Sequence, residues 1–268
     1  MQSIYRFSIL FLLLLAGFVS GCEDVIDVDL NEADPRLVVE AYLTNEVGSA
    51  EVTLSRTTSY FEEQSAQVVI GATVTIRDGN GNIFPLDELT AGKYTNSTLQ
   101  GQPGESYTLE IATGQENVTA TAEMPGLVPI DSLDTQVVQF PIGGQEDLIV
   151  VRCHYVDPAG QLNFYRPLLA INGTLTTDIA VYDDRSNDGI ATAVPLFSDA
   201  LETGDSVRVD LWSIDRTNYY YYNGLADNLG SGNGGSAAPG NPDNNLSGDV
   251  LGVFTVAASS SASIVISD

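Results

Sequence analysis

Residues 72–86 read ATVTIRDGNGNIFPL, and this stretch says most about the fold. Residues 73–77 alternate between polar and apolar side chains, which is the period-two pattern of a half-buried strand. Residues 78–82 then supply glycine and asparagine, which tolerate the positive φ angles of a tight turn, before a second apolar run returns. The stretch therefore predicts a β-hairpin.

Short runs of the same kind continue on both sides of this hairpin. They are rich in β-branched and aromatic residues, and turn residues separate them at strand-sized intervals. The runs before residue 124 cover residues 37–43, 50–54, 72–76, 83–86, 107–111 and 118–122. This spacing predicts an all-β chain whose first domain, residues 37–127, is an immunoglobulin-like antiparallel β-sandwich.

A second β-rich, sandwich-like domain is predicted for residues 128–268. Two prolines and a glycine in residues 124–129 interrupt the strand pattern and mark the boundary. Further strand-like runs cover residues 135–140, 148–155, 163–171, 175–182, 206–213, 250–257 and 262–266. The second domain is also antiparallel in this interpretation.

One short helix is expected in the second domain, near residues 215–229. Asp215 is placed to cap its first amides, and four apolar residues fall on one face: Tyr219, Tyr222, Leu225 and Leu229. Residues 230–245 are rich in Gly, Ser, Asn and Pro, and this composition predicts a long, mobile, exposed loop near the binding surface.

The N-terminus has the pattern of a secretory signal peptide, residues 1–21. Arg6 precedes an apolar run over residues 7–18, which is shorter than the ~20 residues of a membrane span. Residues 19–22, VSGC, resemble a bacterial lipobox, so we expect lipid on Cys22. The alternative is an ordinary signal peptide with an unmodified Cys22.

Residues 22–36 are interpreted as an acidic tether between the lipid and the fold. Glu23 and Asp24 follow Cys22 directly, and they look like the acidic export signal of surface-displayed lipoproteins of the Bacteroidota. A merely solvated linker is the alternative for such a charge run. Display on the cell exterior and attachment to the periplasmic face of the outer membrane therefore both stay open, with the exterior preferred.

The charge balance excludes one class of partner. The chain carries 36 acidic and 10 basic residues, a formal net charge of −26. Nucleic-acid binding depends on Lys and Arg side chains that release counterions from phosphates, so nucleic acid is excluded as a partner. The same charge disfavours adsorption to anionic lipid, which leaves the lipid on Cys22 as the membrane anchor.

No catalytic residues are predicted. Cys153 lies in an apolar strand-like run and is interpreted as a core residue. The chain's one histidine, His154, is its neighbour, but adjacent residues on a strand point to opposite faces. Carboxylate pairs arise by chance among 36 acidic residues, so their number is no evidence for glycosidase chemistry.

The sequence contains one imperfect metal pattern and one aromatic cluster. Residues 184–189 begin like a calcium loop, but Pro195 occupies the twelfth position, where such a loop has Glu. A solvated turn is preferred to weak calcium binding by Asp183, Asp184, Asn187 and Asp188, and no metal or cofactor is assigned. The aromatic cluster is a candidate contact for a ligand or partner protein: Tyr219, Tyr220, Tyr221 and Tyr222.

The order of these motifs resembles that of a known family. The lipobox, the acidic tether, the hairpin of residues 72–86, the motif GESYTL at residues 104–109 and the motif NNLSGDVLGVF at residues 244–254 resemble the Bacteroidota outer-membrane lipoproteins of domain-of-unknown-function family 4249. The family's closing segment usually has an aromatic residue where this chain has Val253. The resemblance implies a two-part β-rich surface lipoprotein, often encoded beside a TonB-dependent transporter, with no known catalytic residues.

The sequence-based hypothesis is therefore a non-enzymatic outer-membrane lipoprotein. It binds a ligand for, or docks onto, a TonB-dependent transporter, and it uses no cofactor. The alternatives are a surface-anchored hydrolase and a structural spacer or adhesin.

Overall fold

The computed structural model describes residues 34–58, 66–139, 148–198, 200–229 and 240–267. Residues 35–268 form one compact unit. In the described part of this unit the chain forms β-strands and a single helix, α2 (Arg216–Asn228). The prediction of an all-β fold with one short helix is confirmed.

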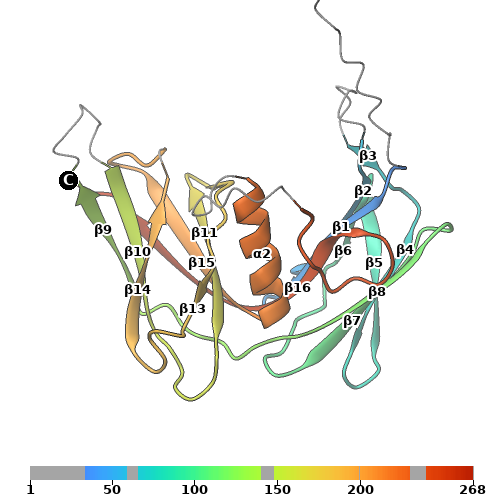
Figure 1. Cartoon of the computed structure of the whole chain (residues 1–268), viewed down its shortest axis with the longest axis horizontal. Coiled ribbons are helices and arrows are strands. Elements are labelled where there is room, and N and C mark those ends of the chain that lie inside the picture. The colour runs from blue at the N-terminus through green and yellow to red at the C-terminus, as the bar shows by residue number, and fades with distance from the viewer. Residues whose placement is uncertain (1–33, 59–65, 140–147, 199, 230–239, 268) are drawn as a thin grey trace, which may run out of the picture. The chain divides into compact units, whose positions relative to one another are not determined.

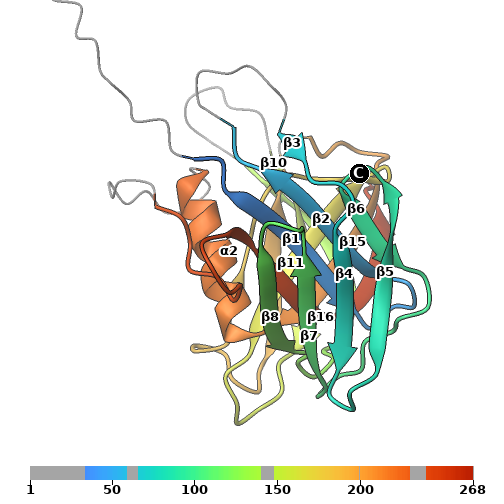
Figure 2. The ribbon, with the colours of Figure 1, turned by 90° about the vertical axis from the view of Figure 1, so that its right-hand side faces the viewer.

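The first half of the unit is a two-layered sandwich. Its strands are β1 (Leu37–Thr44), β2 (Ala50–Arg56), β3 (Gln67–Val68), β4 (Thr73–Asp78), β5 (Ile83–Thr90), β6 (Lys93–Asn96), β7 (Ser106–Ala112) and β8 (Asn117–Glu123). They follow the order β1-β2-β6-β5-β4-β7-β8, with β3 paired to β2 at its side. Strand β5 pairs with β4 through its first half and with β6 through its second half, and the pairing with β6 is irregular between Glu88 and Thr90. Alternate side chains of β1 and β2 share one core with those of β4, β7 and β8, which lie side by side in Figure 2.

The predicted hairpin of residues 72–86 is confirmed. Strands β4 and β5 pair antiparallel, and Val74 and Ile76 are buried between the layers. At the turn the Asp78 carboxylate accepts hydrogen bonds from the backbone N–H groups of Asn80 (3.0 Å) and Asn82 (2.8 Å). Gly81 has a φ of 88°, which glycine adopts without steric cost.

The second half adds a small sheet and the rest of the large one. Its strands are β9 (Ser132–Val138), β10 (Leu148–Val156), β11 (Phe164–Ile171), β12 (Thr174–Leu175), β13 (Tyr182–Asp183), β14 (Ala191–Phe197), β15 (Ser206–Ile214) and β16 (Leu251–Val265). The three-stranded sheet β14-β10-β9 packs on β11 and β15 through a second core. Helix α2 packs on the other side of β11, β15 and β16 through a third cluster.

A single long strand, β16, joins the two halves (Figure 1). The sequence predicted two closing strands, residues 250–257 and 262–266, and this was wrong: the intervening Ala and Ser residues continue the strand. The first part of β16 pairs with β1 in parallel, and the second part pairs with β15 antiparallel. The wholly antiparallel sheet predicted from the sequence is therefore also corrected.

Helix α2 begins where the sequence predicted. The Asp215 carboxylate accepts a hydrogen bond from the backbone N–H of Asn218 at 2.7 Å. Its buried residues are Asn218, Tyr219, Tyr222 and Ala226. Leu229, which was predicted for the same face, is 63% exposed and lies just beyond the last helical residue, as the C-cap.

Two other expectations about the second half were wrong. Residues 175–182 were predicted as one strand, but only their ends pair with β11, as β12 and β13. Strand β14 was not predicted, because Pro195 interrupts its pattern and lacks the N–H that a ladder uses.

The predicted loop of residues 230–245 is described only in part. Residues 230–239 lie outside the described residues, whereas residues 240–245 are fastened to the fold. The Asn228 side chain donates to Gly240 O at 2.6 Å. The Asn245 side chain accepts from the N–H of Phe254 (3.0 Å) and donates to its carbonyl (2.7 Å). The end of this segment is therefore held against the start of β16, contrary to the expectation of a free loop.

Candidate functional site

A cavity of about 820 Å³ lies between β11, β14, helix α2 and the segment of residues 176–182. The residues that line it are Pro167, Leu169, Thr176, Asp178, Ile179, Ala180, Val181, Tyr182, Pro195, Leu196, Phe197, Ser198, Asn223, Ala226 and Asp227. This volume falls in the range of small-molecule sites. The cavity is the candidate functional site.

Residues 176–181 form one wall of the cavity because they leave the β-ladder. Thr176 N–H donates to Leu169 O at 2.8 Å, which fixes the start of the wall. The Tyr182 hydroxyl donates to Pro195 O at 2.7 Å, which ties its end to β14. Between these anchors Ile179 and Val181 pack against the helix cluster. A continuous strand over residues 175–182 would have closed this space.

The lining combines apolar surface with two carboxylates. Leu169 and Leu196 are buried, while Phe197 is 53% exposed and offers its ring to an incoming molecule. Asp178 and Asp227 carry the only charged side chains of the lining. A ligand with an apolar body and no negative charge fits this combination, because the carboxylates repel anions.

The four tyrosines of the candidate contact meet different surroundings. The Tyr219 hydroxyl donates to Asp183 at 2.9 Å, and the Tyr222 hydroxyl lies 2.8 Å from Thr255 Oγ1. Burial raises the pKa of Tyr221 to about 12. Tyr220 is 50% exposed, and the Arg216 guanidinium lies 5.5 Å from its ring centroid.

None of these tyrosines lines the cavity. Helix α2 contributes Asn223, Ala226 and Asp227 instead, one turn further along the chain. The sequence therefore missed the cavity. One signal in the sequence could have pointed to the cavity: Phe197 is a large apolar side chain that no predicted strand would bury.

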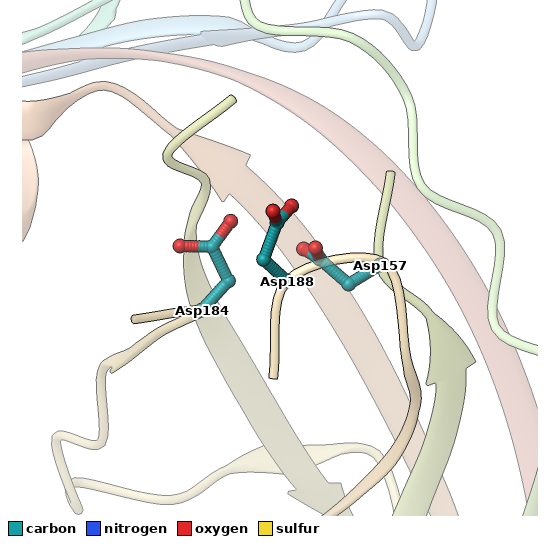
Figure 3. A group of neighbouring side chains, drawn as sticks. All are labelled: Asp157, Asp184 and Asp188. Atoms are coloured by element: carbon teal, nitrogen blue, oxygen red, sulfur yellow. The ribbon is translucent and has the colours of Figure 1, made fainter. Parts of the chain in front are cut away.

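The calcium-like segment places two of its four candidate ligands together. Carboxylate oxygens of Asp184 and Asp188 lie within 4.8 Å of each other and of Asp157, which follows β10 (Figure 3). Asp183 instead pairs with Arg185 at 2.6 Å, and the Asn187 side chain donates to Thr192 at 2.7 Å.

The three grouped carboxylates already accept hydrogen bonds from the protein. The Tyr165 hydroxyl and Gly189 N–H donate to Asp157, Asn163 N–H donates to Asp184 (2.9 Å), and Gly160 N–H donates to Asp188 (2.7 Å). The group explains how two turns are held to β11, and it gives no independent sign of a cation.

Cys153 and His154 point to opposite faces of β10, as predicted. Cys153 is completely buried, and burial raises the pKa of its thiol to about 12. His154 Nε2 lies 3.0 Å from an Asp134 oxygen on the other face. Hydrogen bonds from Arg152 and then His154 lower the pKa of Asp134. The cysteine and the histidine therefore do not form a catalytic pair.

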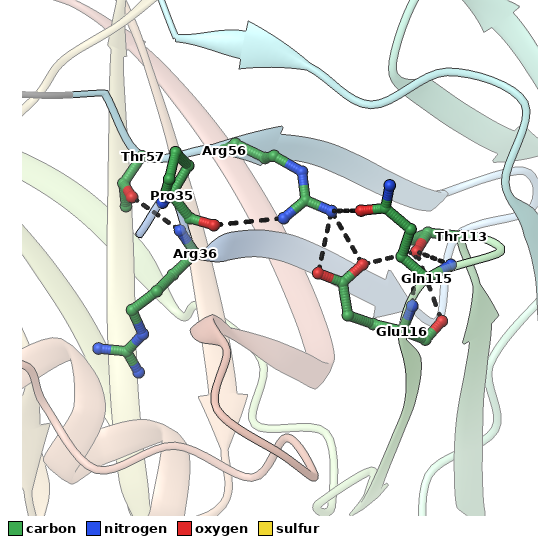
Figure 4. Close-up of polar contacts among 7 residues, drawn as sticks. All are labelled: Pro35, Arg36, Arg56, Thr57, Thr113, Gln115 and Glu116. Carbon is green, nitrogen blue, oxygen red and sulfur yellow. Dashed lines mark hydrogen bonds and ion pairs between the residues drawn. The ribbon is translucent and has the colours of Figure 1, made fainter. Parts of the chain in front are cut away.

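The start of the fold is clamped to β2 (Figure 4). The Arg56 guanidinium donates to Pro35 O at 3.3 Å and pairs with Glu116 at 2.9 Å. Thr57 Oγ1 accepts from Arg36 N–H at 2.9 Å. These bonds fasten Pro35 and Arg36 to the end of β2, and Arg56 links the same point to Glu116 just before β8.

The predicted lipidation and export residues, Cys22, Glu23 and Asp24, lie outside the described residues. No helix in the described part of the chain is long and apolar enough to cross a membrane.

A family model covers almost the whole chain. Residues 23–263 match the model described as "Domain of unknown function (DUF4249)". The chain belongs to the DUF4249 family. This confirms the family resemblance seen in the sequence. No curated protein matches this DUF4249 chain.

Two solved structures match this DUF4249 chain with low scores. One is a pullulanase from Anoxybacillus sp. LM18-11 complexed with maltotriose, 12% identical, with a TM-score of 0.21, over 65% of this chain and 24% of the pullulanase. The other is the chicken interferon gamma receptor alpha chain, 8% identical, with a TM-score of 0.20, over 68% of this chain and 90% of the receptor. The chain thus spans about a quarter of the pullulanase. Scores this low carry no argument about function.

Proposed function

We propose that this DUF4249 protein is a non-enzymatic binding lipoprotein of the outer membrane. It is anchored by lipid on Cys22, faces the cell exterior, and captures a ligand for a TonB-dependent transporter or docks onto that transporter. The ligand occupies the cavity between α2, β11 and β14.

The cavity is the observation that carries this proposal. A volume of about 820 Å³ with a lining that mixes apolar and polar side chains suits a small molecule or a short segment of a partner. A purely structural spacer has no need of such a space, so the cavity favours binding over the spacer or adhesin alternative.

The histidine and the described cysteine give the hydrolase alternative no support. The one histidine pairs with Asp134 on an open strand face, and the one described cysteine is a buried neutral thiol. The cavity lining places hydroxyl groups of Thr176 and Ser198 among its residues with Asp178 and Asp227, but it contains neither the histidine nor the described cysteine.

Binding in the cavity is tested with a neutral dye whose fluorescence rises in apolar surroundings, N-phenyl-1-naphthylamine. Phe197→Ser should weaken dye binding while the melting temperature stays within a few degrees, because the ring is 53% exposed. Ile83→Ser is the matched control: Ile83 is 54% exposed on β5, away from the cavity, and its replacement should leave dye binding unchanged. Equal dye binding by all three proteins would contradict the assignment of the cavity.

The anchor and the partner are tested on the intact lipoprotein. Cys22→Ser should abolish processing at the lipobox and release or mislocalise the protein, and a variant that is still processed and membrane-bound would contradict lipidation.

Wild-type protein purified from solubilised outer membranes should carry the transporter with it. Protease added to intact cells should digest the mature chain; digestion only after lysis would place it on the periplasmic face.

A further inference from the structure

Arg166 is an arginine without a counter-ion in a very acidic chain. Among the other described Lys and Arg residues, all but Arg216 form an ion pair. The residues in these pairs are Arg36, Arg56, Arg77, Lys93, Arg152, Arg185 and Arg208. Arg166 forms no ion pair and no hydrogen bond with any described residue, although the chain has 36 acidic residues. Its Nε atom is buried without a partner.

Aromatic rings hold the Arg166 guanidinium in place. Its central carbon lies 3.9 Å from the ring centroid of Tyr222 on helix α2 and 5.5 Å from that of Trp212 on β15. Tyr42 lies 5.7 Å from Trp212, and Tyr221 meets Tyr222 edge to face at 5.4 Å, both measured between ring centroids. We call these five residues the Arg166 cluster.

This arrangement prepares the guanidinium for an anion. Stacking on a ring fixes the plane of the guanidinium and leaves the N–H groups at its edge free to donate. Arg166 is partly exposed, and of its side-chain nitrogens only Nε is buried and unpaired, so the terminal nitrogens keep access to solvent. A buried donor without a partner costs stability, and an anion beside it would offset that cost.

The other charges around the cluster limit what can bind. The charges of Glu40 on β1 and of Arg166 both act on the Tyr221 hydroxyl, in opposite directions, yet Glu40 forms no ion pair with Arg166. A single positive charge beside one carboxylate suits a monoanion better than a phosphate carrying two charges. A carboxylate also matches the planar fork of the guanidinium with two parallel hydrogen bonds, and the surrounding rings favour an apolar body attached to it.

We propose that the Arg166 cluster is a binding site for the carboxylate of an apolar acid. The site is separate from the cavity: Arg166, Trp212 and Tyr222 are absent from the cavity lining. The acid is either a small molecule or the C-terminal residue of a polypeptide, and the experiment separates these sources.

Trp212 makes the site directly observable, because it is the chain's one tryptophan. Sodium benzoate is titrated into the protein while the Trp212 emission is followed, with benzamide as the uncharged analogue. N-acetyl-Gly-Gly-Phe is used in the same way, as the free acid and as the C-terminal amide. The acids should change the emission saturably, and the amides should not.

Four variants assign the signal to Arg166. Arg166→Gln should weaken acid binding roughly tenfold or more, because the charged hydrogen bonds are lost, whereas Arg166→Lys should retain part of it. Arg216→Gln is the matched control, since it removes the same charge beside an exposed tyrosine and should leave binding unchanged. Glu40→Gln should tighten binding a few-fold by removing a competing negative charge.

Each outcome decides something. Binding of benzoate supports a small-molecule acid, and binding of the free peptide alone supports a polypeptide C-terminus. The proposal is overturned if no acid changes the emission saturably, if the amides bind as well as the acids, or if Arg166→Gln binds like the wild type with an unchanged circular-dichroism spectrum.

Discussion

The two halves of helix α2 meet different surroundings. Its first half rests on the junction where β1 and β16 pair, and its polar groups there are satisfied: Asn218 is completely buried and bonds to Asp215, Phe254 and Thr255. Its second half borders the cavity, where Phe197 and Leu229 are more than half exposed. We call the first region the junction; it stabilises the fold, while the cavity region keeps apolar surface available.

This difference predicts which property of the protein a substitution in each region should reduce. At the junction a substitution removes buried contacts that nothing else can replace, and the cost appears as lost stability. At an exposed residue of the cavity, such as Phe197, a substitution alters a surface that already meets solvent, and the cost appears as lost binding. The following changes test this division, beginning with the largest expected effect.

Gly252→Ala should destabilise the protein more than any other single methyl addition at the junction. Gly252 has a φ of 100°, and an added Cβ would lie 1.9 Å from Val39 O in the parallel pair of β1 and β16. The backbone of one strand would have to move, so we expect a loss of about 4 kcal/mol or failure to fold. Urea unfolding followed by far-ultraviolet circular dichroism measures this loss.

Gly248→Ala is the control for Gly252→Ala. Gly248 has a φ of 88°, but nothing lies within 4 Å of its added Cβ, so only the conformational cost of about 1–2 kcal/mol applies. If the two variants lose equal stability, the close approach of β1 and β16 is not what requires glycine at position 252.

Asn218→Ala should cost about 2–3 kcal/mol. The change leaves the Thr255 hydroxyl without its 2.7 Å acceptor and removes the side-chain bonds to Asp215 and Phe254 in a buried setting. Asn223→Ala is the control in the same helix. Asn223 is exposed beside the cavity, and its loss should change the unfolding free energy by less than about 0.5 kcal/mol. Similar losses in both variants would remove the distinction between the two halves of α2.

The sequence predicted six of the eight strands of the first sandwich because each of these six carries its own signal; the short strands β3 and β6 were not predicted. In the hairpin of β4 and β5, the buried Val74 and Ile76 alternate with polar residues and a glycine turn follows, so local pattern and tertiary packing agree. The helix start at Asp215 was predictable for the same reason, because a cap is a local interaction.

The remainder depended on partners distant in the chain. The Ala and Ser residues in the middle of β16 have no apolar alternation, and they are in a strand because pairing with β15 begins at Ala258, where pairing with β1 ends at Ala257. Residues 176–181 have strand-like composition, yet the bond from Tyr182 to Pro195 and the packing of Ile179 on the helix cluster draw them away from the sheet.

The candidate sites were hidden from the sequence for a related reason. The cavity needs β11, β14 and α2 to meet, and the Arg166 cluster needs Tyr222 and Trp212 to meet across two elements. These contacts join residues that are distant in the sequence, so no local spacing of residues predicts them. The tyrosine run drew attention to α2 correctly, although the cavity uses the following turn of that helix.

The smallest effect is expected for the alkylation of Cys153, which reports on the cavity region. Cys153 pairs with Val194 of β14, and the following residues of β14 wall the cavity. With its thiol pKa raised to about 12 by burial, the thiolate fraction at pH 8 is on the order of 10⁻⁴, so iodoacetamide should react only when this region opens. The experiment uses protein whose Cys22 is lipidated or removed, which leaves Cys153 as the one thiol.

If the cavity region opens locally, Asn218→Ala at the junction should leave the labelling rate within about twofold of the wild type, because the junction stays folded during that opening. If Cys153 reacts only through global unfolding, the same variant should speed labelling about 30-fold or more, as a loss of ~2 kcal/mol requires. The second result would show that the junction and the cavity region unfold as one unit.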